Sequence, residues 1–140
     1  MRPTIIVMSH GKMAEETVNS AKMIVGDIDR IFTVSMKEDD GLAGTTEKLT
    51  AILDNLDPSE KILILADLKG GTPCNVAMMK MAEYPNLHVV AGLNLAMLIE
   101  SIFSPLDSSN EVAAYLETIG KAAVENIQPV TLDEEDEYEE

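Results

Sequence analysis

The sequence is poor in cysteine, tryptophan and positive charge. Cys74 is the single cysteine, so no intramolecular disulfide can form and a reducing compartment, the cytoplasm, is expected. No apolar run reaches the roughly 18 residues of a membrane-spanning helix, and the apolar run near the N-terminus is too short for a signal peptide. Ten Lys and Arg residues oppose 25 Asp and Glu residues, giving a formal charge of -15. Because nucleic-acid binding needs a basic surface, we expect no nucleic-acid partner.

Much of the negative charge lies in one short stretch at the C-terminus. Residues 133–140, DEEDEYEE, contain seven acidic residues, and without them 18 acids still oppose ten bases. Such a charge run is typical of a disordered, solvating end. We therefore expect one domain over residues 1–132 followed by an acidic, disordered tail over 133–140.

Several common site motifs are also missing. There is no G-x-x-x-x-G-K-[ST] or G-x-G-x-x-G loop for a nucleotide and no G-x-S-x-G nucleophile elbow. Two well-separated histidines and one cysteine form no cluster with metal-ligand spacing. We expect neither a metal nor a cofactor.

Short apolar runs alternate with amphipathic stretches of helical length. The apolar runs, rich in β-branched residues, are 4–8, 31–35, 62–66 and 87–91; the helical stretches are 13–25, 45–55, 72–82, 94–101 and 109–126. Continuous apolarity indicates strands buried on both faces, as in a parallel sheet. The alternation predicts an α/β fold with a doubly wound, mainly parallel sheet of four strands and helices on both faces.

A further short strand is expected at residues 127–132, IQPVTL. Pro129 has no amide hydrogen, so this segment is excluded from a central position in a sheet. We expect it at an edge, either of its own sheet or between two chains.

Notable residues follow three of the predicted strands. His10 follows the first strand, and Gly92-Leu93-Asn94 follows the fourth. The third strand is followed by Asp67 and, after two further residues, by the turn Gly70-Gly71-Thr72. Because ligands bind beyond the carboxyl ends of parallel strands, these residues are expected to meet at one edge of the sheet.

Each of these residues has a chemical and a structural interpretation. A histidine before a helix N-terminus is kept neutral, and a carboxylate at Nδ1–H would leave Nε2 free to attack. The Gly70-Gly71-Thr72 turn offers N–H groups and a hydroxyl for an anion. The structural interpretation is that His10, like many lone histidines at strand ends, is an exposed turn residue. Asp67 would then only cap the turn after its strand. Their convergence favours a phosphoryl acceptor.

The remaining candidate residues are interpreted as structural. His88 lies inside an apolar run, and Cys74 is expected at the edge of the core. The nine methionines recur at helical spacing, for instance at Met78, Met79 and Met81, which favours a role in filling the core.

Three segments together resemble a known family. IIVMSHGKMAEE, ILADLKGGTPCNVA and VVAGLNLAMLIE are similar, in order and spacing, to the enzyme IIA domain of the mannose family (mannose, fructose and sorbose type) of the bacterial phosphoenolpyruvate-dependent sugar phosphotransferase system. The resemblance covers residue 4 to about residue 126. Cys74 and the acidic tail depart from the family pattern, and the tail stands where fused members have a linker to a IIB domain.

The resemblance implies a function and a set of partners. His10 would take a phosphoryl group from the histidine-containing phosphocarrier protein, as tele-phosphohistidine, and pass it to a IIB component during sugar uptake. Asp67 would orient His10, and Gly11, Gly70, Gly71 and Thr72 would surround the phosphate. The resemblance also implies a homodimer that exchanges its last strand. The membrane components IIC and IID would interact with this chain only indirectly.

Three other functions remain open on the sequence. One is the related phosphocarrier domain that feeds a dihydroxyacetone kinase, which uses the same kind of histidine. Another is a non-catalytic small-ligand module that keeps the fold, in which His10 would be dispensable. The third is a receiver-like signalling domain phosphorylated on Asp67. A receiver needs an acidic magnesium site after its first strand, and Ser9-His10-Gly11 stands there instead.

Overall fold

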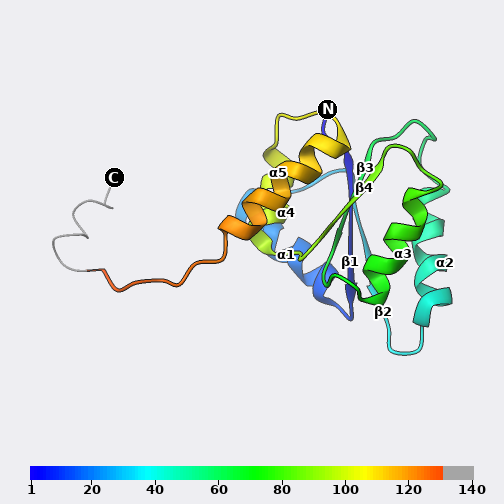
Figure 1. Cartoon of the computed structure of the whole chain (residues 1–140), viewed down its shortest axis with the longest axis horizontal. Coiled ribbons are helices and arrows are strands. Elements are labelled where there is room, and N and C mark those ends of the chain that lie inside the picture. The colour runs from blue at the N-terminus through cyan, green and yellow to red at the C-terminus, as the bar shows by residue number, and fades with distance from the viewer. Residues whose placement is uncertain (131–140) are drawn as a thin grey trace.

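A computed structural model describes residues 1–130 as a parallel sheet between two helical layers (Figure 1). The strands are β1 (Thr4–His10), β2 (Ile31–Met36), β3 (Ile62–Ala66) and β4 (Leu87–Ala91). Their order in the sheet is β2-β1-β3-β4, and every neighbouring pair is parallel. The carboxyl ends of β1 and β3 therefore lie side by side at one edge.

Helices cover both faces of this sheet. They are α1 (Met13–Val25), α2 (Gly41–Leu53), α3 (Thr72–Met81), α4 (Leu95–Phe103) and α5 (Ser109–Ala122). Figure 1 shows α1, α4 and α5 on one face and α2 and α3 on the other. The predicted doubly wound α/β fold is confirmed.

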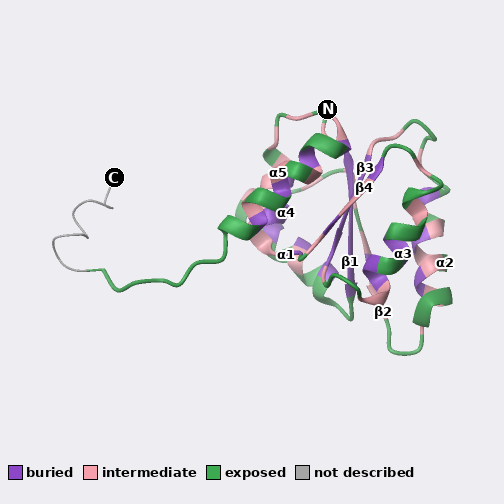
Figure 2. Cartoon of the chain, in the orientation of Figure 1, coloured by how far each residue is buried: buried purple, intermediate pink, exposed green. Residues whose placement is uncertain are grey.

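The two central strands are buried along almost their whole length because each face has its own core (Figure 2). Alternate residues of a strand point to opposite faces. Ile5 and Val7 thus pack into the core beneath α1, α4 and α5, whereas Ile6 and Met8 pack into the core beneath α2 and α3. This explains why these runs are continuously apolar rather than alternating.

The element boundaries differ modestly from the sequence prediction. Strand β1 continues through His10, helix α2 begins at Gly41 rather than at residue 45, and α5 ends at Ala122 rather than at residue 126. Asp40, the residue before α2, accepts the N–H of Lys37 and so turns the chain into the helix early.

One prediction about side-chain packing was wrong. Met78, Met79 and Met81 of α3 are 56%, 49% and 40% exposed, so they do not fill the core. The buried residues of α3 are instead Pro73, Cys74, Val76 and Ala77. Methionine spacing on this short helix gave no indication of which face packs, because three of its last four residues are methionines.

The predicted C-terminal strand is not formed within the described part of the single chain. After α5, residues 123–130 are exposed, and 127–130 belong to no strand. Figure 1 shows this segment leading away from the sheet. Residues 131 and 132, and the tail at 133–140, lie outside the described residues. No helix within residues 1–130 is long and apolar enough to cross a bilayer.

The core between the sheet and α1, α4 and α5 should carry much of the stability. Leu65 is fully buried there, so Leu65→Ala is expected to lower the free energy of unfolding by about 2–5 kcal/mol. Met23 on α1 is 89% exposed and supplies the control. Met23→Ala should change the free energy of unfolding by less than about 0.5 kcal/mol. Urea denaturation followed by circular dichroism measures both, and equal effects would contradict this assignment of the core.

Candidate functional site

His10 and Asp67 are brought together by the pairing of β1 with β3. His10 is the last residue of β1, and Asp67 directly follows β3. Met8 pairs with Ala66, and the N–H of Asp67 donates to the carbonyl of Met8 at 3.1 Å. This backbone bond fixes where the Asp67 side chain starts, beside the end of β1.

One carboxylate oxygen of Asp67 holds His10 at two points. The backbone N–H of His10 and its ring Nδ1 each lie 2.8 Å from Asp67 Oδ2. A carboxylate only accepts hydrogen bonds, so Nδ1 carries a proton, and the tautomer that this contact selects has its lone pair on Nε2. The Asp67 side chain is 8% exposed and that of His10 is 44% exposed. A buried carboxylate therefore orients an accessible imidazole.

Gly71 lies against the imidazole ring of His10. A Cβ at this position would be 2.7 Å from Cε1 and 3.4 Å from Nε2. The turn that brings it there uses Gly70, whose φ of +85° is in the left-handed region that favours glycine. The double glycine thus provides both the turn and the space for the ring.

The amide groups around the ring fall into two sets. The N–H of Gly11 donates to the carbonyl of Met36 at 2.8 Å, and the N–H of Gly71 donates to the carbonyl of Leu68 at 3.0 Å. The hydrogen bonds within residues 1–130 give no acceptor to the N–H of Gly70 or Thr72. Of the residues proposed to surround a phosphate, Gly70 and Thr72 therefore have amides to offer, while Gly11 and Gly71 shape the site.

Ser9 has a part in this turn that the sequence analysis missed. Its buried Oγ accepts the N–H of Ala14 at 2.7 Å and donates to the carbonyl of Gly11 at 3.1 Å. It thereby caps α1 from the preceding strand, whereas the N-cap residue Lys12 makes no side-chain bond. A serine five residues before its partner lies outside the usual capping pattern, so the sequence carried no recognisable signal.

The loop after β2 is held in place next to Gly11. Asp40 accepts the N–H of Lys37 at 2.7 Å and the Nζ of Lys48 at 2.6 Å, and Lys48 also donates to the carbonyl of Ser35. The hydrogen bond from Lys48 is the main cause that holds the pKa of Asp40 below its ordinary value. This pair supports the strand end whose Met36 carbonyl accepts the Gly11 amide.

Two other residues singled out in the sequence are structural. His88 Nδ1 lies 2.7 Å from Ser109 Oγ, away from the site and near the start of α5. Cys74 is a buried free thiol. Within residues 1–130 no three His, Cys, Asp or Glu side chains are grouped to hold a metal ion.

Gly71 offers a direct test of how the imidazole is positioned. In Gly71→Ala the new methyl group must displace the His10 ring, so we expect the Nδ1–H to Asp67 hydrogen bond to lengthen or break while the fold persists. NMR of the ring nitrogens and the Nδ1 proton measures this. Met78→Ala, on the exposed face of α3, should leave those signals unchanged. Unchanged signals in Gly71→Ala as well would show that the ring does not depend on this glycine.

The sequence is similar to those of components of the sugar phosphotransferase system (PTS). The sequence model of the EIIA-man family, described as PTS system fructose IIA component, matches residues 4–120. The PTS system mannose-specific EIIAB component of Escherichia coli is 28% identical over 130 residues, which is 91% of this chain but 40% of that protein. The PTS system fructose-specific EIIA component of Bacillus subtilis is 30% identical over 97 residues, covering 69% of this chain and 66% of that protein. The chain thus spans less than half of the first relative.

Solved structures agree with the sequence comparisons. A mannose/sorbose-specific IIA subunit of the phosphotransferase system from Enterococcus faecalis has 56% identity and a TM-score of 0.90, covering 94% of this chain and 99% of that one. An EIIA component from Streptococcus agalactiae has 25% identity and a TM-score of 0.81, covering 90% and 97%. With the family match extending over both strand ends that carry His10 and Asp67, this chain belongs to the EIIA-man family of sugar phosphotransferase system components.

Proposed function

We propose that this chain is a phosphocarrier that accepts a phosphoryl group on His10 Nε2 and passes it on. The observation that carries the proposal is the contact of His10 Nδ1 with the buried Asp67 carboxylate at 2.8 Å, because it leaves Nε2 of an exposed ring as the nucleophile. The donor is the histidine-containing phosphocarrier protein and the acceptor is a IIB component. The membrane IIC and IID components take part only indirectly.

The transfer requires no metal and no cofactor. The lone pair of Nε2 forms the new N–P bond as the P–N bond of the donor's phosphohistidine breaks, and the electron pair of the broken bond stays on the donor ring. The Nδ1 proton remains between His10 and Asp67, where the carboxylate balances the positive charge that phosphorylation creates on the imidazole. In the next step the phosphoryl group passes on to a IIB component. The N–P bond at His10 Nε2 breaks as a bond to the acceptor forms, and the electron pair of the broken bond stays on the His10 ring.

The start of α3 is the proposed position for the transferred phosphate. The N–H groups of Gly70 and Thr72 have no acceptor among residues 1–130, and helix N-termini favour anions. We propose that these amides and the Thr72 hydroxyl bind the phosphate. Gly71 keeps the space beside Nε2 open, and Gly11 closes the turn beneath His10.

Burial of Asp67 argues against the receiver-like alternative. Its side chain is 8% exposed, and one of its oxygens is engaged by both the backbone and the ring of His10. An incoming phosphoryl group would have to displace His10 to reach it. The dihydroxyacetone-kinase alternative is less favoured because the relatives reported above are named as sugar phosphotransferase components. The buried free thiol of Cys74 is consistent with a reducing compartment, and we assign the relay to the cytoplasm.

Substitution of the two proposed site residues tests this function. With labelled phosphocarrier protein as donor, His10→Ala should take up no label. Asp67→Asn should still be labelled but at least about 100-fold more slowly, since it orients the ring without reacting. His88→Gln is the matched control and should behave as wild type. The label should be stable to alkali and lost in acid; label retained by His10→Ala, or lost in alkali, would contradict the proposal.

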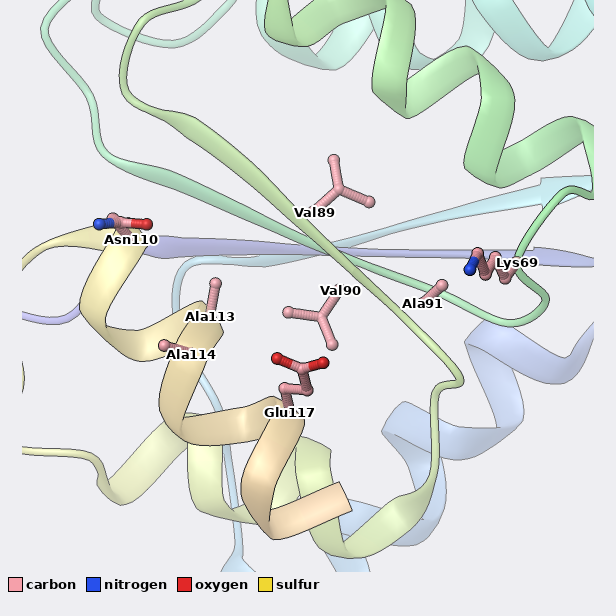
Figure 3. Close-up of a pocket in the computed structure, with 8 residues that line it drawn as sticks. All are labelled: Lys69, Val89, Val90, Ala91, Asn110, Ala113, Ala114 and Glu117. Atoms are coloured by element: carbon pink, nitrogen blue, oxygen red, sulfur yellow. The ribbon is translucent and has the colours of Figure 1, made fainter. Parts of the chain in front are cut away.

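We also propose that two copies exchange their C-terminal segments. Strand β4 is at the edge of the sheet, and a groove of about 360 Å³ runs between it and α5 (Figure 3). Figure 3 shows Val90 on the α5 side of β4, facing Ala113 and Glu117. The segment that leaves α5 carries three exposed apolar side chains, Val124, Ile127 and Val130. An unpaired strand edge and an apolar, unpaired segment are complementary.

Truncation separates the contribution of this segment from that of the acidic tail. We expect removal of residues 124–140 to convert a dimer into a monomer, because the apolar segment is lost. Removal of residues 133–140 alone should leave the dimer intact. Sedimentation velocity at several concentrations measures both, and an unchanged dimer after the longer truncation would refute the exchange.

A further inference from the structure

We infer that the C-terminal segment of a second copy completes the phosphoryl-acceptor site by donating an N–H group to Asp67 Oδ1. The inference rests on the proposed exchange of this segment and adds a contact between the dimer interface and the site itself. Two observations carry it: an unsatisfied oxygen on Asp67, and a cavity that joins Asp67 to the proposed path of the segment.

The two oxygens of Asp67 differ in their partners. Oδ2 accepts both hydrogen bonds from His10. Oδ1 is buried and has no donor among residues 1–130. Buried carboxylate oxygens are rarely left without a donor, because removing the charge from water is then uncompensated. The residue that positions His10 is therefore incompletely held in the single chain.

A cavity of about 590 Å³ borders Asp67 on the side of α5. Val124 of the same chain, where its own C-terminal segment begins, also lines this cavity. Lys69 and Glu117 line both this cavity and the groove along β4, so the two spaces adjoin. Figure 3 shows Lys69 at the Ala91 end of the groove, and Lys69 belongs to the same short turn as Asp67. A segment docked along β4 thus reaches the turn that carries the site.

The direction of α5 determines which part of the segment reaches the cavity. Ser109 at the start of α5 donates to Asn86, just before β4, and Asn94, just after β4, donates to Gly120 near the end of α5. Helix α5 and β4 therefore run in the same direction. A segment that follows α5 and returns along β4 is antiparallel to it, and its first residues lie at the Ala91 end.

Exchange between copies preserves this geometry, because a swapped element makes the same contacts as it would within one chain. The first residues of the segment carry backbone N–H groups and the side-chain amides of Asn126 and Gln128. One of these groups, entering the cavity that Asp67 lines, donates to Oδ1 while Oδ2 keeps its two bonds to His10. With both oxygens bonded, Asp67 holds the Nδ1–H of His10 more firmly, and transfer to Nε2 is faster.

Subunit complementation tests the inference. Both cores lie before residue 117, and the hydrogen bonds of residues 124–130 are local, from Val124 to Lys121 and from Gln128 to Asn126, so a chain ending at residue 123 should fold. This truncated chain, which keeps His10, should be phosphorylated about tenfold more slowly than wild type, the effect of one lost bond to a charged group. Full-length His10→Ala, itself inactive, should restore the rate when mixed with it, by lending its segment. The control is a His10→Ala chain that also ends at residue 123. It has no segment to lend and should not restore the rate.

An independent measurement does not depend on phosphoryl transfer. In unphosphorylated protein the His10 Nδ1 proton should give a protected, downfield NMR signal in wild type, exchange faster in the truncated chain, and recover when full-length His10→Ala is added. A truncated chain with wild-type rate and signal, or a heterodimer that restores neither, would overturn the inference. If the signal follows this pattern but no variant is phosphorylated, the contact stands and the proposed function fails.

Discussion

The hydrogen bonds from His10 to Asp67 Oδ2 are the interaction on which the rest of the site depends. They join the ends of two strands that are distant in sequence and adjacent in the sheet. Because the same oxygen binds the backbone and the ring of His10, the imidazole has one orientation and one tautomer. The sheet, with β1 and β3 buried on both faces, supplies the rigid base that this geometry needs.

The surrounding residues keep the other side of the imidazole open. Gly71 leaves room for the ring, Ser9 caps the helix that follows His10, and the Gly11 amide is held by Met36. Each of these contacts is made by backbone or by a short side chain. The Nε2 side of the ring is therefore bordered by backbone and short side chains, as the proposed transfer of a phosphoryl group to Nε2 requires.

Much of this could be predicted from the sequence, and the exceptions have physical causes. The four strands and the meeting of His10 with Asp67 follow from apolar runs and from the rule that parallel strands end at one edge. The exposed methionines of α3 could not be foreseen, since residue type does not distinguish a packed from a solvent-facing methionine on a short helix. Capping by Ser9, and the use of the Gly11 and Gly71 amides within the protein, depend on turn geometry that spacing does not encode.

The central claim is that Asp67 directs phosphorylation to one nitrogen of His10. Two-dimensional NMR of the ¹⁵N-labelled phosphorylated protein distinguishes the two ring nitrogens and also shows whether Nδ1 keeps its proton. The account predicts phosphorus bonded to Nε2, with a protonated Nδ1 facing Asp67. Phosphorus on Nδ1, or on the carboxylate of Asp67, would contradict it.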